Sequence, residues 1–208
     1  NSNDAPAISS TAVTAATEDS AYSYSITTSD DDSDSSDGWT ITCTTCPSWL
    51  SVTDAGDGTA SLGGTPADAQ VGDHSVVLQV ADTAGATDTQ SFTVTVANTN
   101  DDPTVATAIS DASTDEDAAY SLDISSNFAD VDAGDTLSYT ATGMPTTLTM
   151  STAGVLSGTP VNADVGVHTI VVTATDDATT AASVTDTFEL TVVNTNDPTE
   201  GSSALVGD

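Results

Sequence analysis

Among the residue types of this sequence that could do chemistry, the acidic side chains are the most prominent. The chain has 32 Asp and Glu among its 208 residues, no Lys or Arg and two His, so its formal net charge is -32 at pH 7. Two carboxylates about 4 Å apart repel each other by roughly 1 kcal/mol even in bulk water, and no basic side chain is present to offset this. A stable fold therefore needs carboxylates that are spread apart, a salty medium, or bound cations.

The same charge balance excludes two classes of partner. Binding to nucleic acid depends on Lys and Arg that displace counterions from phosphates. Anionic membranes likewise attract basic segments, and no apolar run approaches the roughly 18 residues of a membrane span. We therefore expect no nucleic acid partner and no direct membrane insertion. Cations, surface glycans and proteins remain as partners, and we expect an extracellular, secreted or cell-surface location.

An internal repeat organises the chain. Leu-Gly-Gly-Thr-Pro at 62–66 returns as Leu-Ser-Gly-Thr-Pro at 156–160, and Asn-Thr-Asn-Asp at 98–101 returns at 194–197. The repeat predicts a first domain at 1–99, a second at 100–197 and a tail at 198–208. The tail is either the start of a following repeat or a donor strand that pairs with an open sheet edge.

Short segments of alternating polarity, separated by turn residues, predict about seven strands in each repeat. The expected strands of the first repeat follow one near Val13 and lie at 21–26, 39–42, 50–52, 59–62, 74–81 and 90–97. Those of the second repeat lie at 105–109, 119–124, 137–142, 148–150, 155–156, 168–175 and 185–193. This pattern predicts an all-β fold of two tandem Ig-like or cadherin-like antiparallel β-sandwiches. Disorder is the alternative for so charged a chain, but patterned apolar segments such as 76–80 argue against it.

Three features together resemble a known family. They are the Trp49-Leu50 pair, the Gly-Thr-Pro turn that follows it, and the Asn-x-Asn-Asp-x-Pro linker at 98–103. These features resemble the dystroglycan-type cadherin-like tandem repeats of prokaryotic surface proteins. The resemblance implies rods of successive domains that Ca²⁺ stiffens at each junction.

The resemblance also implies a set of calcium ligands, since Ca²⁺ takes about six to eight oxygen ligands from carboxylates and carbonyls. The candidate ligands are Glu18, Asp68, Asn98, Asn100, Asp101, Asp102, Asp130, Asp132 and Asp176. The sequence departs from the classical pattern in two ways. Asn98 stands where the classical linker has Asp, and the Asp-Arg-Glu element is represented at most by Asp68 and Asp164. We expect one to three ions at the junction.

Similar acidic residues at both ends of the chain form possible terminal half-sites. Those of the first repeat are Asn3, Asp4, Asp30, Asp32 and Asp82. Those of the second repeat are Glu116, Asp164, Asn194, Asn196 and Asp197. They suggest that copies assemble end to end, or that the chain was cut from a longer array. The alternative is that these residues are solvated loop positions, which any chain this acidic would contain.

The remaining reactive side chains favour structural roles. Cys43 and Cys46 are too few for a zinc site and begin no readable helix of a redox motif, so we expect a local disulfide. His74 and His168 open equivalent strands and favour a structural role. Trp49 is expected in the core, whereas Trp39 is either a core residue or a platform for a sugar ring. No catalytic set is visible, and we expect no enzymatic activity.

Three functions follow as hypotheses. The first is a calcium-rigidified extracellular module with a structural or adhesive role in a cell-surface protein. The second is a subunit of an extracellular filament or surface layer that joins end to end. The third is a glycan-binding module.

Overall fold

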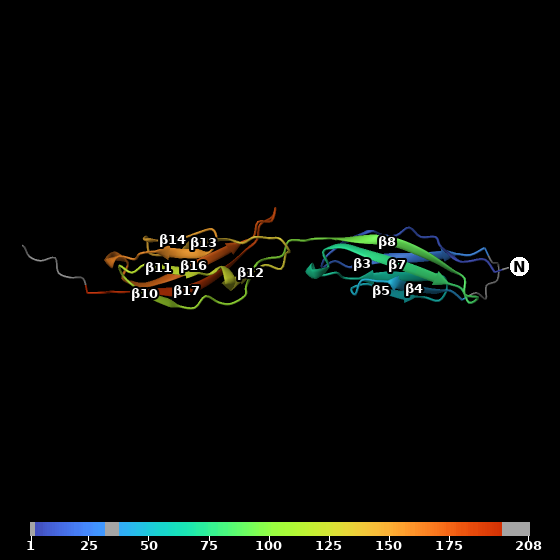
Figure 1. Ribbon diagram of the computed structural model, residues 1–208, viewed down its shortest axis with the longest axis horizontal. Helices are drawn as coiled ribbons and strands as arrows, with labels where there is room; N and C mark the ends of the chain where they lie inside the picture. Colours follow the sequence, from blue (N-terminus) through green and yellow to red (C-terminus); the bar gives the residue numbers. More distant parts are fainter. Residues whose placement is uncertain (1–2, 32–37, 197–208) are drawn as a thin grey trace, which may run out of the picture. The chain divides into compact units, whose positions relative to one another are not determined.

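The computed structural model of the chain describes residues 3–31 and 38–196 (Figure 1). It divides into two compact units, Asn1–Thr99 and Asn100–Asp208, called unit 1 and unit 2 below. The described residues form β-strands and three short 3-10 turns, and none of them lies in an α-helix. The predicted all-β fold of two Ig-like sandwiches is confirmed. Among these residues no helix is long and apolar enough to cross a membrane.

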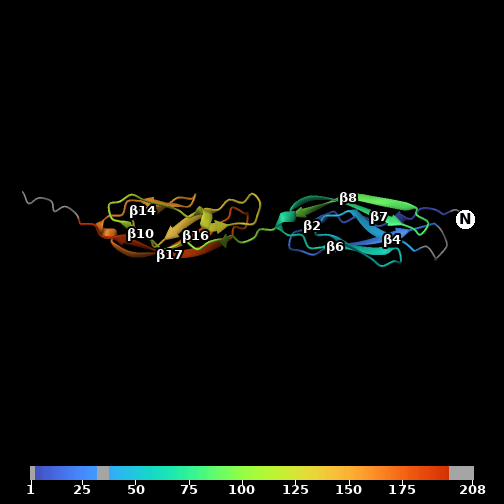
Figure 2. The same cartoon turned by 60° about the horizontal axis from the view of Figure 1, so that its bottom comes forward.

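Unit 1 is a sandwich of two four-stranded sheets (Figure 2). One sheet has the order β1 (Ala7–Ile8), β3 (Tyr22–Ser29), β6 (Thr59–Gly64) and β5 (Ser51–Asp54). The other has the order β2 (Ala15–Thr17), β8 (Thr87–Ala97), β7 (Gly72–Ala81) and β4 (Thr40–Thr45). The strand pairs are antiparallel except for β2 and β8, which run parallel.

The core of unit 1 follows from the period-2 alternation of its strands. In β7, Val76, Leu78 and Val80 are buried and alternate with more exposed positions. They meet inward-facing residues of β3 such as Tyr24 and Ile26 in one cluster. Each such side chain contributes about 1.5–3 kcal/mol relative to exposure to water. This packing holds the loops that carry the acidic residues.

Unit 2 repeats this architecture with a more divided second sheet. Its four-stranded sheet has the order β10 (Ala112–Asp115), β17 (Ser183–Val193), β16 (Gly166–Thr175) and β13 (Ser138–Thr142). Its other strands form a sheet of β11 (Tyr120–Asp123), β15 (Val155–Gly158) and β14 (Leu148–Met150), and a pair of β12 (Phe128–Ala129) and β9 (Thr104–Val105). Ile124, Leu156, Ile170 and Phe188 lie in its core.

The predicted first strand of the second repeat, 105–109, is wrong in extent. Only Thr104–Val105 is a strand, and a second strand follows at Ala112–Asp115. The first pairs with β12 and the second pairs in parallel with β17. Ile109, between them, is buried in the core outside any strand, and its backbone N–H donates to Asp186 at 2.6 Å. The chain changes sheets here, which the polarity pattern of residues 105–109 does not reveal.

Candidate metal centres at the domain ends

The N-terminal end of unit 2 brings together acidic residues from loops that flank three strands. Asp130 and Asp132 follow β12, Asp135 precedes β13, and Asp176 follows β16. Carboxylate oxygens of Asp130, Asp132 and Asp135 all lie within 4.8 Å of one another. We call Asp130, Asp132, Asp135 and Asp176 the entry cluster. The strands fix this arrangement because β12, β13 and β16 each place a side chain in the core of unit 2, namely Phe128, Tyr139 and Ala174.

Two residues of the entry cluster bind the linker that enters unit 2. The backbone N–H of Asp101 donates to Asp132 Oδ2 at 2.8 Å, and Asn100 Nδ2 donates to Asp176 Oδ2 at 3.1 Å. Asp132 and Asp176 are 5% and 4% exposed. Asp102, the next candidate ligand, is exposed. The linker is therefore tied to the acids predicted to share a site with it.

Burial and neighbouring negative charge both act on the carboxylates of the entry cluster. Burial, followed by the charges of Asp132, Asp177, Asp130 and Asp176, raises the pKa of the Asp135 carboxyl. The hydrogen bond from Asn100 lowers the pKa of Asp176. One oxygen of Asp130, Oδ2, is buried without a hydrogen-bond partner. A cation placed here would remove the repulsion and give that oxygen a ligand role.

A glutamate marks the C-terminal end of each unit. Glu18 is 1% exposed, and its Oε1 accepts a hydrogen bond from the backbone N–H of Thr99. Glu116 is 2% exposed, and its Oε1 accepts from Asn194 Nδ2 and from the backbone N–H of Thr195, each at 2.8 Å. In both residues Oε2 is buried and has no hydrogen-bond partner. Burying a carboxylate without a counter-charge is costly, so a cation bound to each glutamate would stabilise the fold.

The N-terminal end of unit 1 has the same design as that of unit 2. Asn3 Nδ2 donates to Asp82 Oδ2 at 2.8 Å, and this bond lowers the pKa of Asp82. Asp4, Asp30 and Asp31 line a hollow of about 120 Å³. Two further candidates of the terminal half-sites, Asp32 and Asp197, lie outside the described residues.

Asp68 and Asp164, the two candidates for the Asp-Arg-Glu element, occupy different positions in the turns that carry them. Asp164 closes the 3-10 turn η3 (Asn162–Asp164), and its Oδ2 accepts from the backbone N–H of Val161 at 3.0 Å and from Thr147 Oγ1 at 2.7 Å. Gln70 does the same work in turn η1 (Asp68–Gln70) of unit 1 by accepting from Ala67 N at 3.1 Å. The hydrogen bonds from Val161 and Thr147 lower the pKa of Asp164, and Asp164 caps its turn.

Other predicted residues lie as follows. Asn98 and Asn196 are exposed and Asp68 is half-buried. The sequence reasoning missed Asp135 and Asp177. Their signals were the Asp-x-Asp-x-x-Asp spacing at 130–135 and the Asp-Asp pair at 176–177, which both follow strands.

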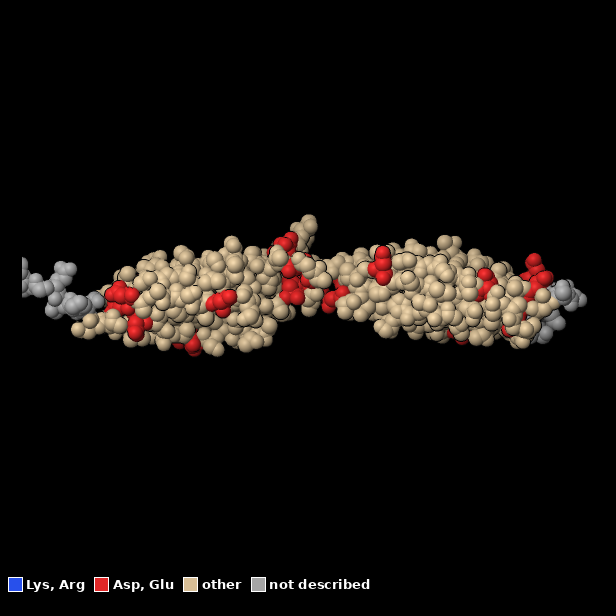
Figure 3. Space-filling model, in the orientation of Figure 1, with Lys and Arg blue, Asp and Glu red and all other residues tan. Residues whose placement is uncertain are grey.

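Acidic side chains gather mainly toward the ends of the sandwiches on the face seen in Figure 3. The strands between the ends present Ser and Thr to solvent, as along β8, where Thr87, Thr89, Ser91, Thr93 and Thr95 are all exposed. Charge is therefore concentrated where the loops meet rather than spread over the sheets.

The cysteine, histidine and tryptophan residues have structural surroundings. Cys43 and Cys46 form the expected disulfide. Nε2 of His74 and of His168 contacts a backbone oxygen four residues earlier, at 2.6 and 2.7 Å. Trp49 and Trp39 are partly buried against the core of unit 1. The space beside Trp39 is tight, since a Cβ added to Gly58 would lie 2.4 Å from its ring.

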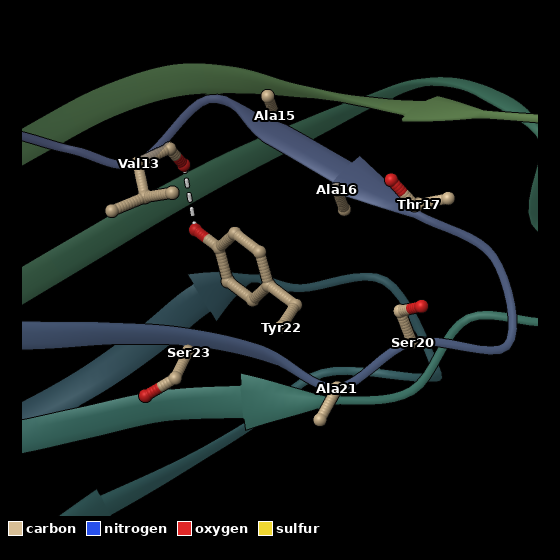
Figure 4. Close-up of a pocket in the computed structure, with 8 residues that line it drawn as sticks. All are labelled: Val13, Ala15, Ala16, Thr17, Ser20, Ala21, Tyr22 and Ser23. Atoms are coloured by element: carbon tan, nitrogen blue, oxygen red, sulfur yellow. Dashed lines mark hydrogen bonds between the residues drawn. The ribbon is translucent and has the colours of Figure 1, made fainter.

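A hollow of about 300 Å³ lies between β2 and β3 of unit 1 (Figure 4). Its lining residues are Val13, Ala15, Ala16, Thr17, Ser20, Ala21, Tyr22 and Ser23. The Tyr22 hydroxyl donates to the Val13 carbonyl at 2.6 Å, and burial raises the pKa of Tyr22 to about 12. None of the eight lining residues carries a carboxylate, imidazole or thiol, so the hollow offers no ligand set for a cation.

Comparison with known families decides the family of the chain. The profile of the family described as "Putative Ig domain" (He_PIG) matches residues 5–97 and 102–193. The chain belongs to the He_PIG family. Its two He_PIG domains coincide with the two sandwiches. No curated protein matches the sequence.

Solved structures show the same fold in cadherins. Extracellular cadherin domains 1–5 of protocadherin gamma B2 match with a TM-score of 0.71 and 17% identity, over 94% of this chain and 41% of that one. Domains EC1-2 of human mucin-like protocadherin match with a TM-score of 0.65 and 16% identity, over 91% of this chain and 98% of that one. An endo-fucoidan hydrolase of glycoside hydrolase family 107, MfFcnA4, shares 26% identity over 92% of this chain, with a TM-score of 0.43. The chain spans only 29% of that hydrolase.

Proposed function

We propose that this chain is a pair of Ca²⁺-binding structural modules from an extracellular or cell-surface protein with a scaffolding or adhesive role. Sandwiches of this kind are common in cell-surface proteins. We propose no catalytic role for the chain. We also propose that its two domains are dystroglycan-type cadherin-like repeats.

The observation that carries the proposal is the entry cluster of unit 2. Three carboxylates approach within 4.8 Å in a chain that has no Lys or Arg to neutralise them. One of their oxygens, Asp130 Oδ2, is also buried and has no hydrogen-bond partner. The cluster therefore has both the negative charge and the available lone pair that a cation site needs. Oxygen-only ligands from carboxylates and carbonyls favour Ca²⁺ over softer metals.

Calcium bound at the entry cluster would act on the linker. Asp132 and Asp176 already hold Asp101 and Asn100 through hydrogen bonds. An ion that fixes these carboxylates would also fix the linker against unit 2. At the C-terminal end of unit 1, an ion on Glu18 Oε2 would restrain Thr99 in the same way. The function is then mechanical, since Ca²⁺ would add to the hydrogen bonds that restrain the linker.

Calcium titration with thermal unfolding tests this proposal. At a Ca²⁺ concentration 100 times the dissociation constant, one site adds about 2.7 kcal/mol, which corresponds to a Tm increase of about 10 °C or more for a domain of this size. Asp130→Asn should remove most of the increase that belongs to the entry cluster. Glu189→Gln is the matched control, because Glu189 is exposed on β17 and the substitution removes the same charge. A Tm that is equal in Ca²⁺ and in EDTA would contradict the proposal.

A further inference from the structure

The C-terminal end of unit 2 carries a carboxylate oxygen that its own chain does not satisfy. Glu116 is 2% exposed, and Asn194 and Thr195 use only its Oε1. Its Oε2 is buried without a hydrogen-bond partner, and the sequence holds no Lys or Arg that could reach it. A buried lone pair of this kind indicates a cation, since an unpaired charge in such a place is otherwise expensive.

The same arrangement occurs once more in the chain. Glu18 binds the backbone of Thr99 and leaves Oε2 buried and unpartnered, as Glu116 does with Thr195. After Thr99 the chain continues directly into Asn100 and Asp101, which are tied to the entry cluster. The end of unit 2 therefore repeats an arrangement that, in its first copy, is followed by an acidic entry end.

The N-terminal end of unit 1 is an entry end of the same construction. Asn3 Nδ2 binds Asp82 Oδ2 at 2.8 Å and the Asp4 carbonyl at 3.0 Å. Asn100 Nδ2 in unit 2 binds Asp176 Oδ2 at 3.1 Å and the Asp101 carbonyl at 3.2 Å. Beside Asn3, the hollow of about 120 Å³ gathers Asp4, Asp30 and Asp31 around a space large enough for an ion. The N-terminal end of unit 1 therefore shares its asparagine–aspartate bond and its gathered carboxylates with the entry end of unit 2.

We propose that these two ends bind each other across copies of the chain through Ca²⁺, so that the copies join head to tail. The inference rests on the proposed function, because it uses the same chemistry of carboxylates and Ca²⁺. Both ends are acidic and repel each other without cations. The Glu116 carboxylate offers at most two of the roughly six to eight oxygens that Ca²⁺ takes, so a second copy would complete the ligands of an ion bound there. A head-to-tail contact joins two different surfaces, and it continues as an open chain of copies unless the rotation between copies closes a ring.

Sedimentation velocity in Ca²⁺ and in EDTA tests this proposal. The wild-type chain should form larger species in Ca²⁺, with a size that increases with protein concentration, and should return to monomer in EDTA. Glu116→Gln should stay monomeric in Ca²⁺, whereas the control Glu189→Gln should assemble like the wild type. Glu116→Gln should also unfold in EDTA at a Tm no lower than that of the wild type, because it neutralises a buried, unpaired charge. That result would separate loss of assembly from loss of folding.

Mixing two defective variants tests the polarity of the contact. Asp30→Asn impairs the entry end and leaves Glu116 intact, whereas Glu116→Gln impairs the opposite end. Each variant alone should remain monomeric in Ca²⁺, and an equimolar mixture should yield dimers and no longer species. Larger species in the mixture, or assembly of Glu116→Gln alone, would overturn the head-to-tail contact.

The outcomes also separate this proposal from the proposed function. A wild-type chain that stays monomeric at all concentrations while its Tm still increases with Ca²⁺ would overturn the assembly and leave the calcium-binding module intact. If Ca²⁺ changed neither the Tm nor the sedimentation of the chain, the calcium-binding function and the assembly would both be overturned.

Discussion

The turn after β6 in unit 1 and the turn after β15 in unit 2 have nearly the same backbone and different side chains. Each is a 3-10 turn whose preceding residue has an extended conformation, with φ of -113° at Ala67 and -116° at Val161. In each, a side chain three residues later accepts a hydrogen bond from that residue, Gln70 in one case and Asp164 in the other. Two sequences thus reach one geometry.

The surroundings of the two turns use opposite chemistry. In unit 1 the Trp49 ring lies edge-on to Tyr22 and to His74, with ring centroids 5.8 Å apart in both pairs. In unit 2 the position of Trp49 is taken by Thr147, whose hydroxyl donates to Asp164 at 2.7 Å. Unit 1 therefore stabilises this end by aromatic packing around Trp49. Unit 2 uses a charged hydrogen bond, which acid can break.

The largest expected loss of stability follows from substituting the glycine that both units place against a backbone carbonyl. A Cβ at Gly64 would lie 1.8 Å from the Trp49 carbonyl oxygen, and one at Gly158 would lie 2.2 Å from that of Thr147. We expect Gly64→Ala and Gly158→Ala each to destabilise its own unit by about 3–5 kcal/mol, because backbone must move. Hydrogen exchange resolved by peptide would measure this. Gly38→Ala is the comparison, because its Cβ would meet only Thr83 Cγ2 at 3.6 Å, an ordinary contact distance. A loss below 1 kcal/mol at Gly64 would show that the close approach is not needed.

Trp49→Thr places the residue of unit 2 in unit 1 and should have the next largest effect. The change removes the contacts with Tyr22 and His74, and we expect a loss of about 2–3 kcal/mol, somewhat less than for a fully buried Trp. Urea unfolding followed through Trp39, which remains in unit 1, measures the loss. Exchange protection in unit 2 serves as the internal control and should not change. Equal stability of the variant and the wild type would mean that the aromatic group is dispensable.

The smallest expected effect is a difference in acid sensitivity. Hydrogen bonds from Val161 and Thr147 lower the pKa of Asp164 below its usual value, so the ionised form stabilises unit 2. That contribution is fully present above the unfolded pKa of about 3.9, and it is lost as the pH falls through the lower folded value. In EDTA, Asp164→Gln should make unit 2 less sensitive to acid below about pH 4, and Gln70→Asp should make unit 1 more sensitive. Unchanged pH profiles in both variants would refute the assignment.

The fold could be predicted from sequence because burial leaves a pattern. Alternating residues such as Val76, Leu78 and Val80 mark an inward face, and the repeated Gly-Thr-Pro turn marks equivalent positions. The division of the first strand could not be predicted, since Val105 and Ile109 are both buried or half-buried while only the first lies in a strand. Hydropathy reports burial, and it does not report which sheet a residue joins.

The sequence predicted several residues of the candidate site correctly, but it did not predict the full set. Glu18, Asp132 and Asp176 lie at the domain ends, as their positions beside strands indicated. Asp68 and Asp164 were both proposed to represent the Asp-Arg-Glu element, although the repeated Gly-Thr-Pro turn already aligns Asp164 with Gln70. The geometry adds that both aligned side chains cap the turn. Asp135 was overlooked because its proximity to Asp130 and Asp132 arises from the loop conformation rather than from strand register.

The irregular pairing of β4 has a consequence for solubility. Its register against β7 shifts between Cys43 and Thr45, beside the disulfide of Cys43 with Cys46. β4 is an edge strand, and exposed regular edges invite sideways pairing between molecules and amyloid-like aggregation. A bulge locked by a covalent bond spoils the template that such pairing needs. The β4 edge of unit 1 therefore resists lateral pairing between molecules even at high protein concentration.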